Sequence, residues 1–540
     1  MPTIEVIIFL LVVLVVFSAI VERLKIPQSI MLVVAGLAIG FTPQLPDVAL
    51  SPDTVFLIFL PPLLFTAALK LSWHDVKAEK GAIISLATGL VFFTTLAIAV
   101  VAHYFIPGFS WQLAFVLGAI ISPPDAMAAM SVTKGLNLNR RVITILEGES
   151  LLNDASALVA YRYAIAGIVT GGFVFWKASL QFVWVAGGGL FIGLVIGWAV
   201  LWALRRIKDN TTLEVALTIL TPYTAYLLAE HFHLSGVLAV VAAGLFMSFQ
   251  APEAFSYKTR IQTNNFWNTI EFLLNGFVFI LIGMQLPVIL TNIEKSSLAG
   301  AAGYGLLITG VAIFVRILWV FPGAYLPVAL SKRGQRNARK IDWRYITIIA
   351  WTGMRGVVSL AAAMAIPLTL ANGEAFPERN MILFITFFVI FFTLVVQGLS
   401  LPLLIRLLKI SADDSRLREE ELKVRKLLAL QTVAFIDQEL TKGETDDKVI
   451  RRLRNKYAAR LKLAGGMAEQ EQHGDANGVN SVIDIYTQYA NLQKALLDFE
   501  RALLVQMHKE DGASSTILKK LESELDIEET RLTAQLKRVS

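Results

Sequence analysis

An aspartate at position 154 lies inside an apolar stretch, Ile143 to Val169, that is long enough to cross a lipid bilayer. Two glutamates, Glu147 and Glu149, precede it in the same stretch. A charged side chain at the centre of a membrane-spanning helix costs about 3 kcal/mol on insertion scales, and such side chains mark ion or substrate pathways. We therefore expect residues 147–154, Glu-Gly-Glu-Ser-Leu-Leu-Asn-Asp, to carry the function.

The composition indicates an all-α polytopic membrane protein. The chain has 540 residues, 55% of them hydrophobic, and a mean hydropathy of +0.62. It contains no cysteine, which excludes disulfides and thiol chemistry, and its six histidines lack the His-Glu-x-x-His spacing of zinc enzymes. We expect no cofactor and no enzymatic activity. The apolar segment from Thr3 to Ile20 lacks the features of a signal peptide, so we expect it to be a retained first span.

The apolar segments predict thirteen membrane-spanning helices, and loop charge predicts their direction. The predicted spans are residues 4–20, 28–42, 54–70, 81–106, 112–133, 142–169, 180–204, 212–229, 235–249, 267–290, 298–330, 345–370 and 381–408. Loops after odd-numbered spans carry nineteen Lys and Arg residues, whereas loops after even-numbered spans carry three. Positive charge concentrates on the cytoplasmic side, so we place the N-terminus outside and the C-terminus in the cytoplasm of an inner (plasma) membrane protein. The net charge of +6 therefore indicates orientation in the lipid bilayer rather than nucleic-acid binding.

The composition changes after the last span. Residues 1–408 form a predicted transmembrane domain, and residues 409–540 form a charged, helix-prone cytoplasmic C-terminal domain. Apolar residues at helical spacing begin near Leu422 and recur near Val482. Two roles of this tail remain open, assembly as a solvated helix pair and regulation.

Two of the predicted spans contain helix breaks. Span five contains Ser122-Pro-Pro-Asp125, in which two prolines remove two backbone donors, and span twelve contains Thr352-Gly-Met-Arg-Gly356. Spans one to six and eight to thirteen place these breaks at the same position in two six-helix repeats of opposite topology. Inverted repeats with crossed broken helices are typical of secondary transporters, whose binding site lies near the bilayer midplane.

Depth along each span places three charged residues together. At 1.5 Å per residue, Asp154 lies roughly 20 Å from the cytoplasmic end of its span, Arg355 about 16 Å and Asp125 about 14 Å. All three are near the middle of a hydrocarbon core about 30 Å thick. Broken helices are tolerated at that depth only inside protein or beside a hydrated cavity. We therefore expect these residues around a central hydrated cavity.

Helical angles separate the carboxylates of span six. Ser150 and Asp154 are four residues apart and share a face, and Glu147 lies on the same side nearer the cytoplasm. Glu147 is either part of an inner entrance path or a charge close to the interface. Glu149 points about 140° away from Asp154. We expect Glu149 to form a structural ion pair with Arg355, with Arg162 as a second candidate partner.

The oxygen-bearing side chains of these spans predict which ion binds there. Asp154 and Asp125, with freed backbone carbonyls and the Ser150 hydroxyl, suit a dehydrated sodium ion, because hard cations select oxygen. The same carboxylates hold protons, so sodium and protons compete for one site. Asn153 is a neutral donor beside Asp154, and a hydrogen bond between helices is the alternative role for its side chain.

Four motifs resemble those of one transporter family. Glu-Gly-Glu-Ser-Leu-Leu-Asn-Asp at 147–154, Ser-Pro-Pro-Asp-Ala at 122–126, Gly-Met-Arg-Gly at 353–356 and Pro-Pro-Leu-Leu-Phe at 61–65 are similar to signatures of the monovalent cation:proton antiporter-1 family. This family includes NhaP-type bacterial sodium/proton antiporters and animal sodium/proton exchangers. The resemblance covers about residues 1–408 and does not extend to the tail.

The resemblance implies further expectations. It implies a homodimer, with a dimerisation bundle and a six-helix core that moves like an elevator in each protomer. It implies Asp154 as the essential ion and proton site, with Asp125, Ser150 and the Pro124 carbonyl as co-ligands. Asn rather than Asp at position 153 implies electroneutral exchange. The family usually has an acid where this chain has Thr66, which puts an acidic gate in span three in doubt.

We therefore predict a secondary transporter that exchanges sodium for protons across the membrane. Lithium is expected to compete, and potassium is the alternative cargo. A hypothesis from another class is a cation channel or a membrane sensor that signals through its tail. A channel would favour a filter sequence repeated across subunits, and no such sequence is present.

Overall fold

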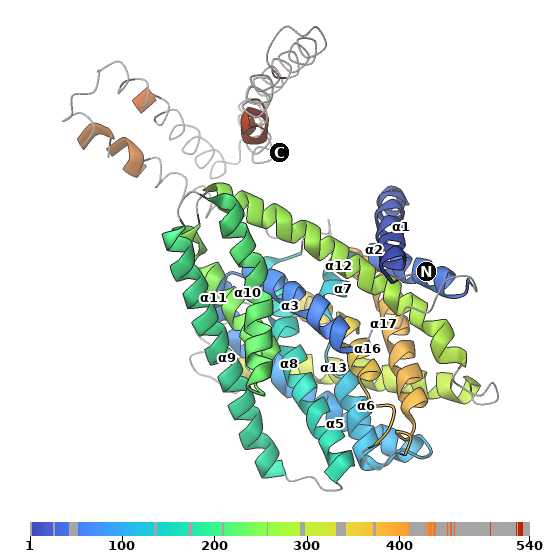
Figure 1. The fold of residues 1–540 in the computed structure, drawn as a ribbon. Helices are drawn as coiled ribbons and strands as arrows, with labels where there is room; N and C mark the ends of the chain where they lie inside the picture. The colour runs from blue at the N-terminus through green and yellow to red at the C-terminus, as the bar shows by residue number, and fades with distance from the viewer. Residues whose placement is uncertain are drawn as a thin grey trace. The chain divides into compact units, whose positions relative to one another are not determined.

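The structure, a computed structural model (Figure 1), is helical throughout the regular elements of the residues that it describes. Those residues are 3–24, 27–42, 52–133, 138–170, 175–207, 210–255, 257–291, 298–330, 342–370 and 374–409, with short stretches between 427 and 532. The chain divides into two compact units, Met1–Ala412 and Asp413–Ser540. The function of each predicted domain, residues 1–408 and 409–540, remains a prediction.

The first unit contains the helices that bear on function. They are α1 (Thr3–Leu24), α2 (Gln28–Gly40), α3 (Pro52–Lys70), α4 (Trp73–Ile84), the π-helical turn η1 (Ser85–Leu90), α5 (Val91–Phe105), α6 (Trp111–Ile121), α7 (Ala126–Thr133), α8 (Arg140–Thr170), α9 (Phe175–Arg206), α10 (Thr211–His231), α11 (Gly236–Ala254), α12 (Tyr257–Thr291), α13 (Leu298–Leu330), α15 (Trp343–Trp351), α16 (Val357–Met364) and α17 (Arg379–Leu407). Each of the thirteen predicted spans overlaps one of these helices or a consecutive set of them.

Helix length and composition support a membrane location. Within the described residues, six helices are long and apolar enough to cross a bilayer: Asp75–Phe105, Gln181–Arg206, Thr211–His231, Lys258–Thr291, Leu298–Tyr325 and Arg379–Leu407. Five shorter helices are also apolar: Glu5–Val21, Gln28–Gly40, Leu57–Lys70, Trp111–Ile121 and Gly236–Ala251. The total of thirteen crossings and the inverted repeats remain predictions.

Both predicted helix breaks are present. Span five is divided into α6 and α7 by the segment Ser122–Asp125, and span twelve into α15 and α16 by Thr352–Gly356. The predicted C-terminal end of span twelve, residue 370, is too late, because α16 ends at Met364. The helix ends before Pro367, which has no backbone N–H to continue it. Arg379 binds the freed carbonyl oxygens of Met364 and Ile366, at 3.4 and 3.0 Å.

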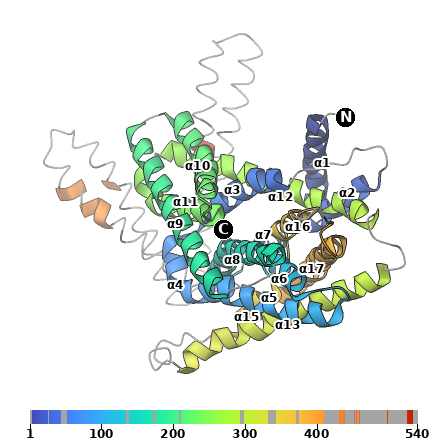
Figure 2. The same ribbon diagram turned by 60° about the horizontal axis from the view of Figure 1, so that its bottom comes forward.

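Two hydrophobic clusters organise the first unit. The larger cluster joins residues of α5, α6, α13, α16 and α17 with residues of α1, α2 and the second half of α12. The smaller cluster joins α3, α9, α10 and α11, and Figure 2 shows α9, α10 and α11 grouped apart from α6, α16 and α17. Helix α8 contributes to both, with Leu146 in the larger cluster and Leu151 and Ala155 in the smaller one.

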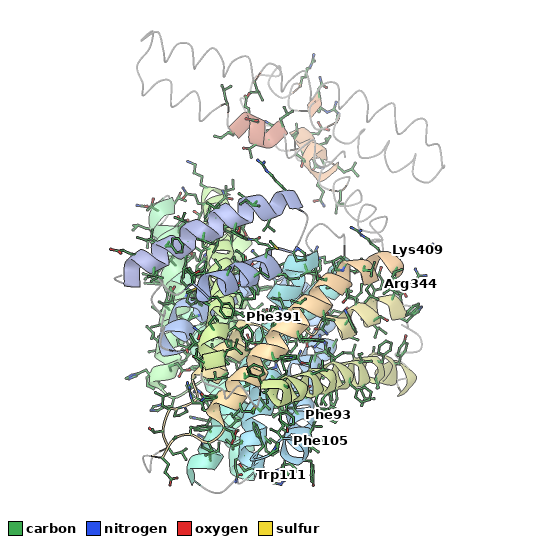
Figure 3. All side chains as sticks on the ribbon, turned by 90° about the vertical axis from the view of Figure 1, so that its right-hand side faces the viewer. Phe93, Phe105, Trp111, Arg344, Phe391 and Lys409 are labelled. Carbon is green, nitrogen blue, oxygen red and sulfur yellow. The ribbon has the colours of Figure 1, made fainter. Side chains whose placement is uncertain are left out.

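Polar and aromatic residues mark the two ends of the helical bundle. Figure 3 shows Arg344 and Lys409 at one end and Phe105 and Trp111 near the other. Trp111 stacks on His103 with ring centroids 4.3 Å apart. The direction in which these spans cross the membrane remains a prediction from loop charge.

The second unit is described only in part. Its described residues include a hydrophobic contact among Leu497, Leu525 and Leu532, and an ion pair between Arg454 and Asp437 at 2.8 Å. Leu427 and Leu430, which belong to the predicted apolar stripe, are exposed. The predicted apolar residues near Val482 lie outside the described residues.

Small residues allow α2 and α12 to cross closely. A Cβ atom added to Gly36 would lie 2.1 Å from the backbone oxygen of Ile280, and one added to Gly283 would lie 2.1 Å from that of Val33. A backbone oxygen cannot move away as a flexible side chain would. Close crossings of this kind depend on glycine, as they do in other membrane helix pairs.

We predict that Gly36→Ala destabilises the protein by roughly 1–3 kcal/mol, the usual cost of overpacking. The measurement is the thermal unfolding midpoint of the purified protein in detergent. Gly310→Ala is the control, because a Cβ atom at that position meets no heavy atom within 4 Å. Equal midpoints for the two variants would contradict the close crossing.

Candidate functional site: an acidic cavity at two crossing helix breaks

The two helix breaks contact each other. The backbone N–H of Asp125 donates to the carbonyl oxygen of Met354 at 2.7 Å. The Asp125 side chain packs directly on Gly356, where an added Cβ atom would lie 1.7 Å from Oδ2. Position 356 therefore requires glycine if Asp125 is to keep this place.

The ends of the half-helices give the crossing its electrostatics. The Ala128 N–H donates to Asp125 Oδ1 at 3.4 Å, so the carboxylate caps α7. Gly356 is the N-cap of α16 and has no side chain to cap that helix. Two helix N-termini thus approach one carboxyl group.

Carbonyl groups at the two breaks accept hydrogen bonds from side chains. The Ser122 hydroxyl donates to Ala119 O at 3.1 Å. The Arg355 guanidinium donates from Nε to Ile121 O at 2.6 Å and from Nη1 to Gly353 O. Arg355 therefore binds the C-terminal end of α6, where a cation is favourable for the helix dipole.

One cavity collects the predicted ion-binding residues. It has a volume of about 270 Å³ and is lined by Pro124, Asp125, Ser150 and Asp154, and by the predicted entrance residue Glu147. Glu147, Ser150, Leu151 and Asp154 recur at the spacing of one helical face. The opposite wall comes from α3 and α12, and it includes Phe59, Leu64, Lys70, Glu271 and Asn275.

The mouth of this cavity carries an ion pair. Lys70 at the end of α3 pairs with Glu271 of α12, and both line the cavity together with Glu147. The Lys70 side chain is 46% exposed, so this end of the cavity faces the surface of the unit. Asp154, by contrast, is 8% exposed and lies two helical turns beyond Glu147 along α8.

Asn153 lies behind the cavity rather than in its lining. Its side chain is fully buried, and Nδ2 donates to the Pro124 carbonyl at 2.7 Å. Asn153 Oδ1 has no hydrogen-bond partner in the described part of the chain. The hydrogen bond between helices, considered as an alternative above, is therefore present, and it fixes the carbonyl oxygen that the break frees.

The predicted ion pair between Glu149 and Arg355 is wrong. Glu149 instead binds Arg316 of α13, with Nη1 to Oε1 at 2.6 Å and Nη2 to Oε2 at 2.9 Å. Arg316 Nε also donates to Ile349 O at 3.1 Å. The alternative partner Arg162 binds Glu230, at 3.0 Å to each carboxylate oxygen.

Sequence reasoning missed Arg316 although a signal was present. The helical angle correctly turned Glu149 away from Asp154, but the search for a cation considered only the broken span and span six. Arg316 lies near the middle of α13, a helix of 33 residues that is otherwise strongly apolar. A lone arginine at such a depth is expected to have a buried partner.

Thr66 stands where the antiporter family usually has an acid, and its hydroxyl bonds to the backbone of its own helix. It is 1% exposed and its hydroxyl donates to Pro62 O at 2.7 Å. It is not among the residues that line the cavity. The wall that α3 contributes is therefore apolar at this depth, with Lys70 as its charged residue.

Taken together, the fold and the cavity define a class of protein. Discontinuous helices that cross around buried acids are the arrangement in which secondary transporters bind ions and substrate. Comparison with known proteins identifies the transporter family.

The family described as the transmembrane sodium/hydrogen exchanger matches residues 8–407. An uncharacterised Na⁺/H⁺ exchanger of Mycobacterium bovis is 31% identical over 533 residues, which are 98% of this chain and 96% of that protein. A sodium, potassium, lithium and rubidium/H⁺ antiporter of Bacillus pumilus is 37% identical over 388 residues, which are 70% of this chain and 58% of that protein.

Among solved structures, a sodium proton antiporter of Methanocaldococcus jannaschii has the same fold. The TM-score is 0.60 with 21% sequence identity, and the match covers 74% of this chain and 97% of that one. The chain therefore belongs to the sodium/hydrogen exchanger family of monovalent cation:proton antiporters, and it is a multi-pass membrane protein.

We predict that Arg316→Ala lowers stability by about 3–5 kcal/mol, because it leaves the Glu149 carboxylate buried without its partner. Folded yield and thermal midpoint in detergent measure this effect. Arg162→Ala is the control, because that pair is exposed and is worth about 0–1 kcal/mol. A folded yield of Arg316→Ala equal to that of the control would show that the buried pair is not structural.

Proposed function

We propose that the protein exchanges sodium for protons across the membrane, with Asp154 as the group that both cations occupy in turn. The observation that carries this proposal is the shared cavity, which Asp125 and Asp154 line at the crossing of two broken helices. Membership of the sodium/hydrogen exchanger family supports the same reaction class.

Competition for one carboxylate supplies the coupling. The oxygens of Asp154 and Asp125, the Ser150 hydroxyl and the Pro124 carbonyl form a hard donor set for a dehydrated sodium ion. A proton on Asp154 removes the negative charge that the sodium ion requires. The site therefore carries either cation from one side to the other but not both together, which is antiport.

Asn153 supports an electroneutral cycle. The residue beside Asp154 is neutral, and its amide is already engaged with Pro124 O at 2.7 Å. Asp154 then releases one proton for each sodium ion that it binds. A second acid at position 153 would change the charge carried in each cycle.

The two packed groups of helices support alternating access of the elevator type. The cavity lies between α3 and α12 on one side and α7, α8 and α16 on the other. Its open end at Lys70 and Glu271 is the cytoplasmic side according to loop charge. We propose that the group carrying the broken helices moves against the other group, in a homodimer within the inner membrane, with the N-terminus outside and the tail in the cytoplasm.

Potassium is the second candidate cargo. The relative from Bacillus pumilus is named as an antiporter of sodium, potassium, lithium and rubidium, and it is 37% identical to this chain. The donor set contains only oxygen, which also suits a larger alkali cation when the cavity permits. Vesicles challenged with sodium, lithium or potassium chloride in turn distinguish these cargoes.

We expect everted vesicles that contain the protein to dissipate a preset pH gradient when sodium is added. Asp154→Asn should abolish this response, because an amide cannot exchange a proton for a cation. Glu79→Gln is the control, because it removes a carboxylate that pairs with Arg141 away from the cavity. Normal exchange by Asp154→Asn at equal expression would remove Asp154 from the mechanism.

We also expect competition to appear in the pH dependence of transport. As pH falls on the side that binds sodium, the apparent KM for sodium should rise, approaching about tenfold per pH unit, because each tenfold increase in protons displaces the cation equally. The maximal rate at saturating sodium on that side should change much less. A KM that is independent of pH would indicate separate proton and cation sites.

A further inference from the structure

Ser359 is a polar residue of α16 that the predicted site does not include. It lines the same cavity as Asp125, Ser150 and Asp154. The residue is 2% exposed, and its hydroxyl has no hydrogen-bond partner in the part of the chain that the structure describes. A buried hydroxyl without a partner is destabilising, so its presence at a cavity needs a reason.

Several buried hydroxyls of other helices in this protein bind their own backbone. Thr66, Thr352 and Thr393 each donate to the carbonyl four residues earlier, at 2.7, 2.9 and 2.8 Å. This back-bonding is the usual solution for serine and threonine inside a helix. Ser359 departs from it, as do Thr263 and Thr386 within the described residues, but of these three only Ser359 lines the cavity.

The helix break explains the departure. Helix α16 begins at Val357, so Arg355, four residues before Ser359, lies outside the helix. The neighbouring carbonyls of the break are also engaged, Gly353 O by Arg355 and Met354 O by the N–H of Asp125. The first turn of α16 therefore presents a hydroxyl that the backbone does not use.

The register of α16 directs Ser359 toward the acids. Gly356 contacts the Asp125 carboxylate, and Ser359 follows three residues later on the same face of the chain. Both residues line the cavity. The orientation is thus fixed by two independent observations, the contact at Gly356 and the lining position of Ser359.

We infer that the Ser359 hydroxyl is a ligand of the transported cation, supplied by the second broken helix to complete the oxygen set of Asp125, Ser150 and Asp154. This inference rests on the proposed function. A hydroxyl adds an oxygen without adding charge, so it increases the affinity for a cation and leaves the stoichiometry unchanged. A small dehydrated ion depends more on each oxygen of its shell, so Ser359 favours sodium and lithium over potassium.

The chain offers a matched control in Thr386 of α17. Thr386 is fully buried, and its hydroxyl also lacks a partner within the described residues. It is not among the residues that line the cavity. A variant at Thr386 therefore tests the loss of a buried hydroxyl without altering the proposed oxygen set.

The first experiment measures sodium binding and exchange by Ser359→Ala in reconstituted vesicles and in detergent. We expect the apparent sodium affinity to fall about tenfold, as for loss of one net hydrogen-bond-sized contact, while the affinity for potassium changes less. The sodium-induced rise of the thermal midpoint should require correspondingly more sodium. Ser359→Thr keeps the hydroxyl and should retain the wild-type affinity, and Thr386→Val should leave it unchanged.

The second experiment uses the absence of cysteine from the natural sequence. A small cationic methanethiosulfonate should label Ser359→Cys in the full-length protein, and sodium should slow this labelling. Thr386→Cys should remain unlabelled. Because labelling needs no transport, it tests the position of residue 359 even when Ser359→Ala folds poorly.

The outcomes separate this inference from the proposed function. Two results would overturn the role of Ser359 and leave the proposed antiport intact. One is a sodium affinity of Ser359→Ala equal to that of the wild-type protein, with sodium/proton exchange still present. The other is labelling of Ser359→Cys that sodium does not slow. Equal losses in Ser359→Ala and Thr386→Val would also overturn it, because the effect would then belong to any buried hydroxyl. Absence of sodium-driven exchange in the wild-type protein would overturn the proposed function itself.

Discussion

The contact between the two helix breaks is the constraint on which the site depends. The hydrogen bond from Asp125 N to Met354 O, and the packing of the Asp125 side chain on Gly356, hold four half-helices in one crossing. Arg355 stabilises that crossing by binding the last carbonyl of α6. The N-termini of α7 and α16 then approach Asp125, and the proposed cation site and its supporting charges arise from one backbone arrangement.

The supporting charges are divided between two arginines with separate tasks. Arg316 neutralises Glu149 from α13, and Arg355 satisfies the broken backbone. Neither arginine is among the residues that line the cavity that holds Asp125 and Asp154. Among the basic residues of the described chain, Lys70 is the one that lines this cavity, at its mouth.

The sequence predicts the site's chemistry better than its packing. Pro123 and Pro124 locate one break, and the spacing of Glu147, Ser150 and Asp154 places them on the face that lines the cavity. The partner of Glu149 could not be derived in the same way, because a helical angle gives a direction and not the helix that lies there. Ser359 gave no signal, since a serine in an apolar helix usually bonds to its own backbone.

Helix α8 packs with one set of residues in the larger hydrophobic cluster and with Leu151 and Ala155 in the smaller one. Residues of both clusters line the cavity beside Asp154, Phe59 and Phe279 from the larger one and Leu60, Leu64 and Leu151 from the smaller one. Any displacement of α8 in the proposed transport cycle therefore changes side-chain packing in both clusters at once.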